Sequence, residues 1–320
     1  MIRAYDLALA EPLETGRGLL TSFTGALHEH PDGGLGDHPG LEAVQGFGQE
    51  LRNFAQETAE LDASARGAGE PLYKLISRRF LGDSVGPRPG ARVLVHLTTS
   101  LSQALAASGM AYLRGIGTLK IKVPQTETWT SVRRQLEELR LVQPMMNIRL
   151  DFAGGWENDL RRGVDLRPRL HDLADLAIEY VEDPVLPQSL AQVPRDILPI
   201  AADVVDLAPG EANRLVSSLG VRTLVVKPQL FGTWGAAINL IQMAQSKGIQ
   251  VVLSSLYDGP VGIAALLHLA VALGLTESAQ GLNTLALCTP HPCRVLKPGR
   301  DGRIAVPEGA GLGLDRPWAP

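Results

Sequence analysis

From about residue 91 onward, short β-rich runs alternate with longer helical patterns, and this rhythm restricts the fold more than any other feature. Successive runs are separated by roughly 20 to 33 positions, the length of one βα unit. Eight such runs predict a closed parallel barrel wrapped in helices. An open doubly wound sheet would need a glycine-rich phosphate turn after an early strand, and no such turn occurs. The runs are Val93–Leu97, Thr118–Val123, Asn147–Phe152, Ala177–Val181, Leu198–Ala202, Thr223–Val226, Ile249–Leu253 and Leu282–Leu287.

The segments between these runs carry helical periodicity. Val132, Leu136 and Leu139 recur at spacings of four and three residues, and charged residues occupy the other faces. This pattern is typical of a helix with one buried side. Further helices are expected at Ala236–Ala244 and, in a shorter form, at Glu211–Leu219.

The first 90 residues do not follow this rhythm. Leu19–Leu27 is predicted to form a strand, and Glu42–Ala55 and Pro71–Phe80 are predicted to form helices. The loop His28–Gly40 is a candidate lid over an active site, although a solvated turn is the simpler interpretation. Glycine and proline are frequent in residues 81–90, which indicates a linker.

The fold class that follows is α/β: a modified (β/α)7β TIM-type barrel with an α+β N-terminal capping domain. We expect the capping domain to span residues 1–90 and the barrel to span residues 91–290. The segment 291–320, rich in proline and glycine, is expected to pack back on the capping domain.

Charge and hydropathy exclude several classes of partner. The net charge is −4 and the pI is near 6.0, which favours neither nucleic acid nor an anionic membrane as partner. Met1–Pro12 lacks the basic start and apolar run of a signal peptide. Val261–Leu275 is shorter than the roughly 20 residues that span a bilayer, so it is expected to be a buried helix.

The two cysteines, Cys288 and Cys293, are too few for a disulfide framework. His291 lies between them, but three candidate ligands in a proline-rich stretch are a weak signal for a metal. Reduced thiols and a cytoplasmic location are therefore expected.

Acidic residues stand at or directly after the ends of three consecutive runs: Asp151, Glu182 and Asp203. In a (β/α) barrel the active site lies at the carboxyl ends of the strands, and neighbouring strands are about 5 Å apart. The three carboxylates can therefore converge. A lone aspartate at a strand end is more often a helix cap, but three anions in series would repel one another. A hard cation with oxygen ligands, such as Mg²⁺, would relieve that repulsion.

Lysines flank this series. Lys122 lies at the end of the second run and Lys227 directly follows the sixth, so the two would face each other across the barrel mouth. Lys120 alternates with Lys122 and would point to the same inner face. A nearby cation is expected to lower the lysine pKa, so that a neutral, basic amine becomes available near pH 7.

The series of strand ends resembles the enolase superfamily, and within it the o-succinylbenzoate synthases of the muconate-lactonizing-enzyme-like subgroup. The similarity covers about residues 91–290, and the chain would be a divergent member. The segments that carry it are Leu119–Val123 (LKIKV), Ile148–Asp151 (IRLD), Glu182–Pro184 (EDP), Ala201–Asp203 (AAD), Val225–Pro228 (VVKP), Leu253–Ser255 (LSS) and Gly281–Thr284 (GLNT).

The resemblance implies a role for each matching residue. Asp151, Glu182 and Asp203 would bind Mg²⁺, which Mn²⁺ can replace. Lys122 would remove the proton next to the substrate carboxylate, and Lys227 would stabilise the enediolate from the opposite face, a scheme already known for this superfamily.

The implied substrate is a small carboxylate, and the implied reaction is a Mg-dependent carbon–oxygen lyase reaction. It is the syn dehydration of 2-succinyl-6-hydroxy-2,4-cyclohexadiene-1-carboxylate to o-succinylbenzoate in menaquinone biosynthesis. Lys122 would return a proton to the leaving hydroxyl. The residues that would bind or orient the substrate are Lys120, Arg149, Ser254 and Ser255.

Several positions around the expected pocket depart from the family pattern. Ala153 stands where an asparagine is frequent, Val204 where a glutamate follows the strand-five aspartate, and Tyr257 and Asp258 where a Glu-Ser pair is usual. Three alternatives within the superfamily therefore stay open: N-acylamino acid racemase, dipeptide epimerase and muconate cycloisomerase. A Schiff-base aldolase barrel and a non-catalytic binding scaffold are the alternatives outside it.

Overall fold

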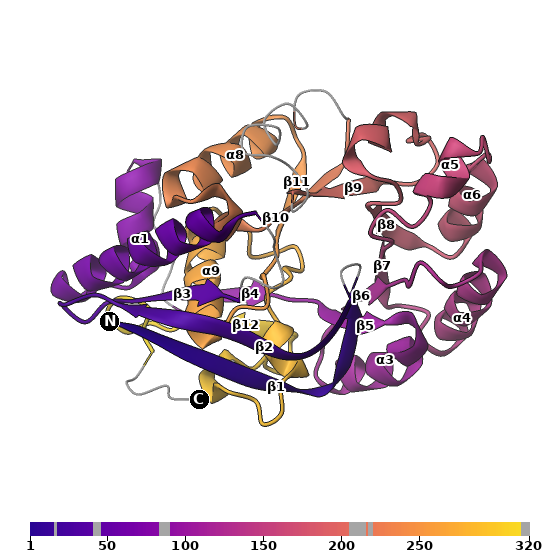
Figure 1. Cartoon of the computed structure of the whole chain (residues 1–320). Helices are drawn as coiled ribbons and strands as arrows, with labels where there is room; N and C mark the ends of the chain where they lie inside the picture. The colour runs from indigo at the N-terminus through magenta and orange to yellow at the C-terminus, as the bar shows by residue number, and fades with distance from the viewer. Residues whose placement is uncertain (16–17, 41–45, 83–89, 205–215, 217–219, 315–320) are drawn as a thin grey trace.

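A parallel sheet of seven strands, with the order β11-β10-β9-β8-β7-β6-β5, forms the centre of the molecule. The computed structural model describes residues 1–15, 18–40, 46–82, 90–204, 216 and 220–314 (Figure 1). The strands of this sheet are β5 (Leu97–Ser100), β6 (Thr118–Lys122), β7 (Asn147–Asp151), β8 (Ile178–Glu182), β9 (Ile200–Asp203), β10 (Thr223–Val226) and β11 (Gln250–Leu253).

Two isolated bridges close the sheet into a barrel. Gly281 pairs with Ser254 directly after β11, and Gln280 pairs with Val95 two residues before β5. The predicted (β/α)7β barrel is therefore confirmed. The eighth strand was expected at Leu282–Leu287, and this is wrong, because Thr284–Leu287 forms the 3-10 helix η7. Apolar side chains spaced three residues apart suit a helical turn as well as a strand.

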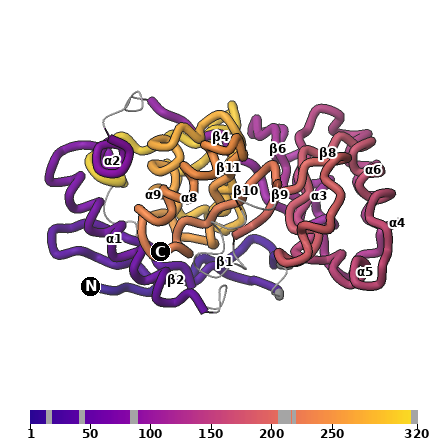
Figure 2. The backbone as a smooth tube through the Cα atoms, turned by 90° about the horizontal axis from the view of Figure 1, so that it is seen from above, coloured from indigo at the N-terminus to yellow at the C-terminus, as the bar shows by residue number. Residues whose placement is uncertain are grey.

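Helices cover the outside of the barrel (Figure 2). The helix predicted around Val132, Leu136 and Leu139 is present, and those three residues are its buried ones. The expected buried helix is also present, and the residues Pro260–Val271 are all buried. The barrel helices are α3 (Ala104–Leu113), α4 (Trp129–Val142), α5 (Glu157–Arg161), α6 (Arg167–Asp175), α8 (Trp234–Ser246) and α9 (Pro260–Ala272).

The N-terminal region forms an antiparallel sheet of β1 (Ile2–Thr15), β2 (Gly18–Glu29) and β3 (Leu35–Pro39). Figure 1 shows β1 and β2 as a long ribbon beside the barrel. The sheet packs on α1 (Gly48–Gly67), which α2 (Leu72–Ile76) and a π-helical turn (Ser77–Leu81) follow.

A loop was expected at His28–Gly40, and this is wrong for Leu35–Pro39, which form the strand β3. Gly36 lets β3 lie directly against α1, because a Cβ atom at this position would approach the carbonyl oxygen of Ala55 to 1.8 Å. Asp37 is only 3% exposed. A segment fixed by strand pairing and close packing does not fit the proposed lid.

The run Val93–Leu97 divides between two sheets, which corrects the first predicted strand. β4 (Arg92–Leu94) pairs antiparallel with β12 (Arg303–Ala305), and the barrel strand β5 begins only at Leu97. The partner β12 lies more than 200 positions away in the sequence, so local hydrophobicity could not reveal the division.

The C-terminal segment contacts the N-terminal helices. The Leu312 N–H donates to Asp62 of α1 at 2.7 Å, and the Leu72 N–H of α2 donates to the Gly311 carbonyl at 2.7 Å. The division into residues 1–90, 91–290 and 291–320 remains our proposal. Most of the expected linker 81–90 and of the helix Glu211–Leu219 lies outside the described residues. Among the described helices, none is long and apolar enough to cross a bilayer.

Candidate functional site

The predicted functional residues lie together at the carboxyl ends of the barrel strands. Strand register places Lys122 beside Asp151, and Asp151 beside Glu182. Asp203 ends β9 and pairs with Val225 of β10, two residues before Lys227. Parallel pairing therefore brings side chains from four consecutive strands, and the lysine that follows a fifth, to one mouth.

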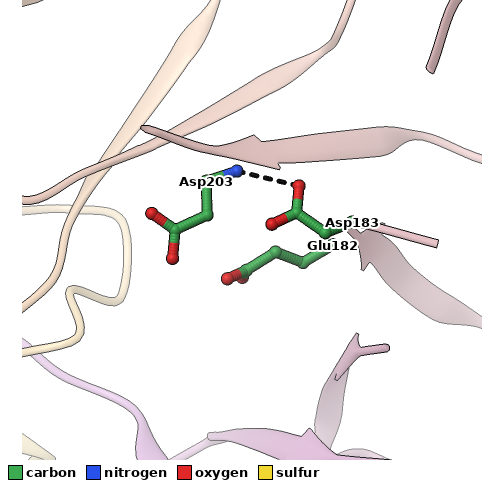
Figure 3. Close-up of side chains that lie close together, drawn as sticks. All are labelled: Glu182, Asp183 and Asp203. Atoms are coloured by element: carbon green, nitrogen blue, oxygen red, sulfur yellow. Dashed lines mark hydrogen bonds between the residues drawn. The ribbon is translucent and has the colours of Figure 1, made fainter. Parts of the chain in front are cut away.

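Three carboxylates gather most closely at this mouth (Figure 3). Ligand atoms of Glu182, Asp183 and Asp203 all lie within 4.8 Å of one another, the one such acidic group within the described part of the chain. The Asp203 N–H donates to Asp183 Oδ1 at 3.0 Å. Asp183 has a φ of +43°, and this unusual backbone conformation accompanies its position in the cluster.

Asp151, the first of the three predicted ligands, is not in that group. Its Oδ2 atom accepts from Lys122 Nζ at 2.8 Å and lies 3.2 Å from Lys120 Nζ. Lys120 also donates to Glu182 Oε1 at 2.6 Å. The two lysines of β6 thus draw the Asp151 carboxylate towards their own strand.

Lys227 forms an ion pair with Asp203 on the other side of the mouth. Lys227 and Lys122 follow or end different strands, β10 and β6, which lie four positions apart in the sheet order. Ammonium groups therefore approach the carboxylates from both sides.

The electrostatics of the cluster leave it short of positive charge. Burial raises the pKa of Glu182; Lys120 lowers it, Asp151 and Asp203 raise it, and the net result is a raised pKa. Burial, followed by repulsion from Asp203, Glu182 and Asp151, raises the pKa of Asp183 well above its ordinary value. Glu182 Oε2 is buried and has no hydrogen-bond partner among the described residues. A buried carboxylate oxygen without a partner is costly, so this donor set fits a hard divalent cation.

The lowered lysine pKa was expected beside a bound cation, and that expectation stays a prediction. Burial lowers the pKa of Lys122, but the charge of Asp151 outweighs burial, so the pKa is raised. Burial of Lys120 is likewise outweighed by Asp151 and Glu182. The prediction assumed that a cation already neutralised these carboxylates, and without that charge they stabilise the ammonium form.

Arg149 lies one layer below the mouth and is fully enclosed, with 1% of its surface exposed. Its guanidinium donates twice to Glu179, at 2.8 and 2.9 Å, and once to the carbonyl of Ala279 at 2.6 Å. It also lies 3.1 Å from His96 Nδ1. All of these contacts lie inside the barrel, so Arg149 stabilises the strands that carry the site residues.

Ser254 and Ser255 follow β11 at the mouth. Ser255 Oγ and Thr284 Oγ1 are 2.8 Å apart and share a hydrogen bond. The Ser255 N–H donates to the carbonyl of Gly281 at 3.1 Å. The serines therefore connect the seventh strand to the residues that take the place of the eighth.

Asn283 is a buried polar residue beside the site and was not among the predicted site residues. It is 4% exposed, and neither Oδ1 nor Nδ2 has a partner among the described residues. Asn283 directly precedes Thr284, whose Oγ1 atom lies 2.8 Å from Ser255 Oγ, so the backbone of Asn283 lies beside the mouth. The available signal was its place in the GLNT segment (Gly281–Thr284), one of the segments that carry the family resemblance.

The N-terminal sheet supplies one wall next to the mouth. Phe23 of β2 lies 4.9 Å, centroid to centroid, from the ring of Tyr257. Both rings line a cavity of about 120 Å³ together with Leu20, Leu256 and residues of β2. Tyr257 has a φ of +64°, an uncommon conformation for a bulky residue. The substitution noted at Tyr257 thus places an aromatic wall beside the mouth.

The sequence of the chain is similar to those of several known proteins. Residues 103–317 match the enolase C-terminal domain-like family. The chain is 31% identical to an o-succinylbenzoate synthase of Thermobifida fusca, over 72% of this chain and 67% of the relative. It is 27% identical to an L-Ala-D/L-Glu epimerase of Bacillus subtilis, over 68% of this chain. That match spans 58% of the length of the epimerase.

Solved structures share the fold. A dipeptide epimerase of Enterococcus faecalis, solved with Mg and the dipeptide L-Leu-L-Tyr, superposes with a TM-score of 0.77. It has 21% sequence identity, and the match covers 98% of both chains. The capped barrel is therefore the shared architecture.

Proposed function

The chain belongs to the enolase C-terminal domain-like family, and from that premise we propose that it removes the proton next to a substrate carboxylate. The proposed reaction is dehydration of 2-succinyl-6-hydroxy-2,4-cyclohexadiene-1-carboxylate to o-succinylbenzoate. The single observation that carries this proposal is the pair Lys122 and Lys227, which reach the carboxylate cluster from opposite sides. The synthase-like strand ends and the synthase relative support it.

The proposal includes Mg²⁺, held by Asp151, Glu182 and Asp203. The Glu182 Oε2 atom is buried and has no hydrogen-bond partner among the described residues, so a bound cation would stabilise it. When bound, Mg²⁺ supplies positive charge that stabilises the anion developing on the substrate carboxylate. Asp183 lies in the same cluster, and its carboxylate is a competing candidate ligand.

The lysines carry the proton transfers. Lys122, as a neutral amine, takes the proton from the carbon next to the carboxylate, and the electron pair of that bond moves onto the carboxylate to give an enediolate. That electron pair then forms the new ring double bond as the carbon–oxygen bond to the hydroxyl breaks, and Lys122 returns the proton to the leaving oxygen. Water leaves, the ring becomes aromatic, and Lys122 is neutral again. The Lys227 ammonium would stabilise the negative charge of the substrate after its proton has been removed and before the hydroxyl leaves.

Neutral side chains near the eighth strand favour a substrate without a free amine. Asn283 and Thr284 are uncharged, and Asp258 is fully buried, where it accepts two hydrogen bonds from Gln229 at 2.8 Å. A dipeptide ammonium needs a carboxylate partner when it is desolvated. This arrangement argues for dehydration over dipeptide epimerisation.

Racemisation of N-acylamino acids is the second candidate. Lysines on both sides of the mouth would each serve one face of the substrate carbon. An acylated amine is neutral, so it would also suit the amide of Asn283. An N-succinylamino acid racemase of Thermus thermophilus is 24% identical over 85% of this chain.

The test is a direct assay of the purified protein with the succinylated hydroxycyclohexadiene carboxylate and Mg²⁺. Formation of o-succinylbenzoate should stop in excess chelator and return with Mg²⁺ or Mn²⁺. No product in the presence of Mg²⁺, together with turnover of N-acylamino acids, would replace dehydration with racemisation. Turnover that persists in excess chelator would contradict the metal site.

A further inference from the structure

A cavity of about 300 Å³ lies between the end of α3 and the C-terminal segment. Arg114 follows α3 and precedes β6, so it belongs to the face opposite the mouth, where the barrel strands begin. The residues that line the cavity are Arg114, Ala286, Cys288, His291, Lys297 and Pro298. None of them belongs to the proposed active site.

The cavity is electropositive in a chain whose net charge is −4. Residues 291–300 contain Arg294, Lys297 and Arg300 and no acidic residue. Within the described ranges, the structure gives the side chains of Arg114 and Lys297 no acidic partner. Two cations thus border one cavity without a counter-charge.

His291 adds a hydrogen-bond donor. Its Nδ1 atom accepts from the Cys293 N–H at 3.2 Å, so in the neutral ring the proton lies on Nε2. Burial, with smaller contributions from Lys297 and Arg114, lowers the pKa of His291 to about 4, which keeps the ring neutral near pH 7. Nε2 is buried and has no partner among the described residues. The ring therefore holds an N–H donor that lacks an acceptor.

Close backbone packing fixes the two sides of the cavity. A Cβ atom at Gly115 would lie 1.9 Å from the carbonyl oxygen of Arg300. A Cβ atom at Gly302 would lie 2.4 Å from the carbonyl oxygen of Gly115. The backbone at the end of α3 and that of the C-terminal segment are thus held together, and the exposed side chains of Arg114 and Lys297 border the cavity from these two segments.

The donor set argues against a metal ion here. Arg114 and Lys297 place positive charge at the cavity, and that charge repels a cation. His291 Nδ1 is already occupied by a backbone N–H. The polar groups that remain available to a ligand are the N–H donors of Arg114, Lys297 and His291, and the first two are positively charged.

We propose that this cavity binds a small oxyanion, such as a phosphate or carboxylate group attached to a compact apolar body. The volume of about 300 Å³ is at the lower end of the range for small-molecule sites. Arg114 and Lys297 would neutralise the anion, and Ala286 and Pro298 would contact the apolar part. Arginine and lysine both bind phosphate oxygens well.

The test measures binding of inorganic phosphate by calorimetry to the full chain, in chelator and at constant ionic strength, with chloride as reference. The double variant Arg114→Gln, Lys297→Gln should bind at least about 10-fold more weakly, the loss expected when charge-assisted hydrogen bonds disappear. Arg114→Lys keeps the charge and should retain most of the affinity. Arg134→Gln, an exposed change on α4, is the matched control and should not alter binding.

Two outcomes would overturn the proposal: no phosphate binding beyond that of chloride, or equal binding by the wild type and the double variant. The second would place the phosphate elsewhere, for example at the mouth lysines. Circular dichroism of the double variant and of Arg114→Lys establishes that they fold. The readout does not depend on the proposed dehydration, so the two proposals can fail separately.

Discussion

The Lys122 ammonium lies 2.8 Å from Asp151 Oδ2, so the proposed base donates directly to a proposed metal ligand. This contact links the two halves of the proposed chemistry. The carboxylate that holds the lysine in its charged form is the same one that would take part in binding the cation. A change at either residue should therefore alter both proton transfer and metal binding.

Replacing Lys122 by Ala should lower kcat by about 10³-fold or more, because the general base is lost. Mg²⁺ binding should be kept or tightened, since Asp151 loses a competing ammonium group. Steady-state kinetics and calorimetric Mg²⁺ titration measure the two effects. Lys74→Ala, an exposed change on α2, is the control. Near wild-type turnover of the Lys122 variant would remove the catalytic assignment.

Asp151→Asn and Asp183→Asn should separate a metal ligand from its neighbour. Loss of the Asp151 charge should weaken Mg²⁺ binding by more than about 100-fold. Asp183→Asn retains the Oδ1 atom that accepts from the Asp203 N–H, and its effect should stay near 10-fold, as for residues that orient ligands. Calorimetric titration checks both. The reverse order of affinities would make Asp183 the third ligand in place of Asp151.

Asn283→Leu should stabilise the fold and impair activity together. Both amide atoms of Asn283 lack partners within the described chain, and a buried polar group without a hydrogen bond costs about 1–3 kcal/mol. An apolar side chain of similar volume should raise Tm by roughly 2 °C or more and lower kcat/KM by about 10-fold. The exposed change Asn147→Leu is the control. Unchanged activity would show that Asn283 does not contact the substrate.

The pH dependence of stability should report a carboxyl pair between the capping region and the barrel. Asp37 of β3 accepts from Tyr5 OH at 2.8 Å and from the Gly262 N–H at 3.0 Å. Burial, followed by repulsion from Asp258, raises the pKa of Asp37 to about 7. Burial also raises the pKa of Asp258 to about 6.

A raised carboxyl pKa means that the folded chain holds protons that the unfolded chain loses above about pH 4. The free energy of unfolding from this pair should therefore fall as pH rises from about 4 to 7, by a few kcal/mol at most. Urea unfolding at fixed pH values measures it. In Asp37→Asn this decline should be much smaller, and an identical pH profile would count against the pair.

The barrel could be predicted from the sequence because its signal is local. Each buried strand is a short apolar run and each helix buries one face, as for Val132, Leu136 and Leu139 of α4. The β1 strand carried the same kind of signal: Tyr5, Leu7 and Leu9 are buried and alternate with exposed residues. That alternation is a local strand signal, so β1 is also predictable from the sequence.

Other features depend on distant partners and could not be read locally. The pairing of β4 with β12 decides where the first barrel strand begins. The position of Asp183 in the cluster depends on its φ of +43°, since strand alternation alone would point it away from Glu182. The raised pKa of Lys122 depends on its distance to Asp151, which only the folded chain defines.

The proposed metal site can be tested by a crystal structure of the protein grown with Mn²⁺, with the ion located by its anomalous scattering. We expect one ion at the barrel mouth, bound by oxygens of Asp151, Glu182 and Asp203, with Lys122 and Lys227 on either side. An ion bound elsewhere, or these three carboxylates turned apart around no ion, would contradict the proposed site.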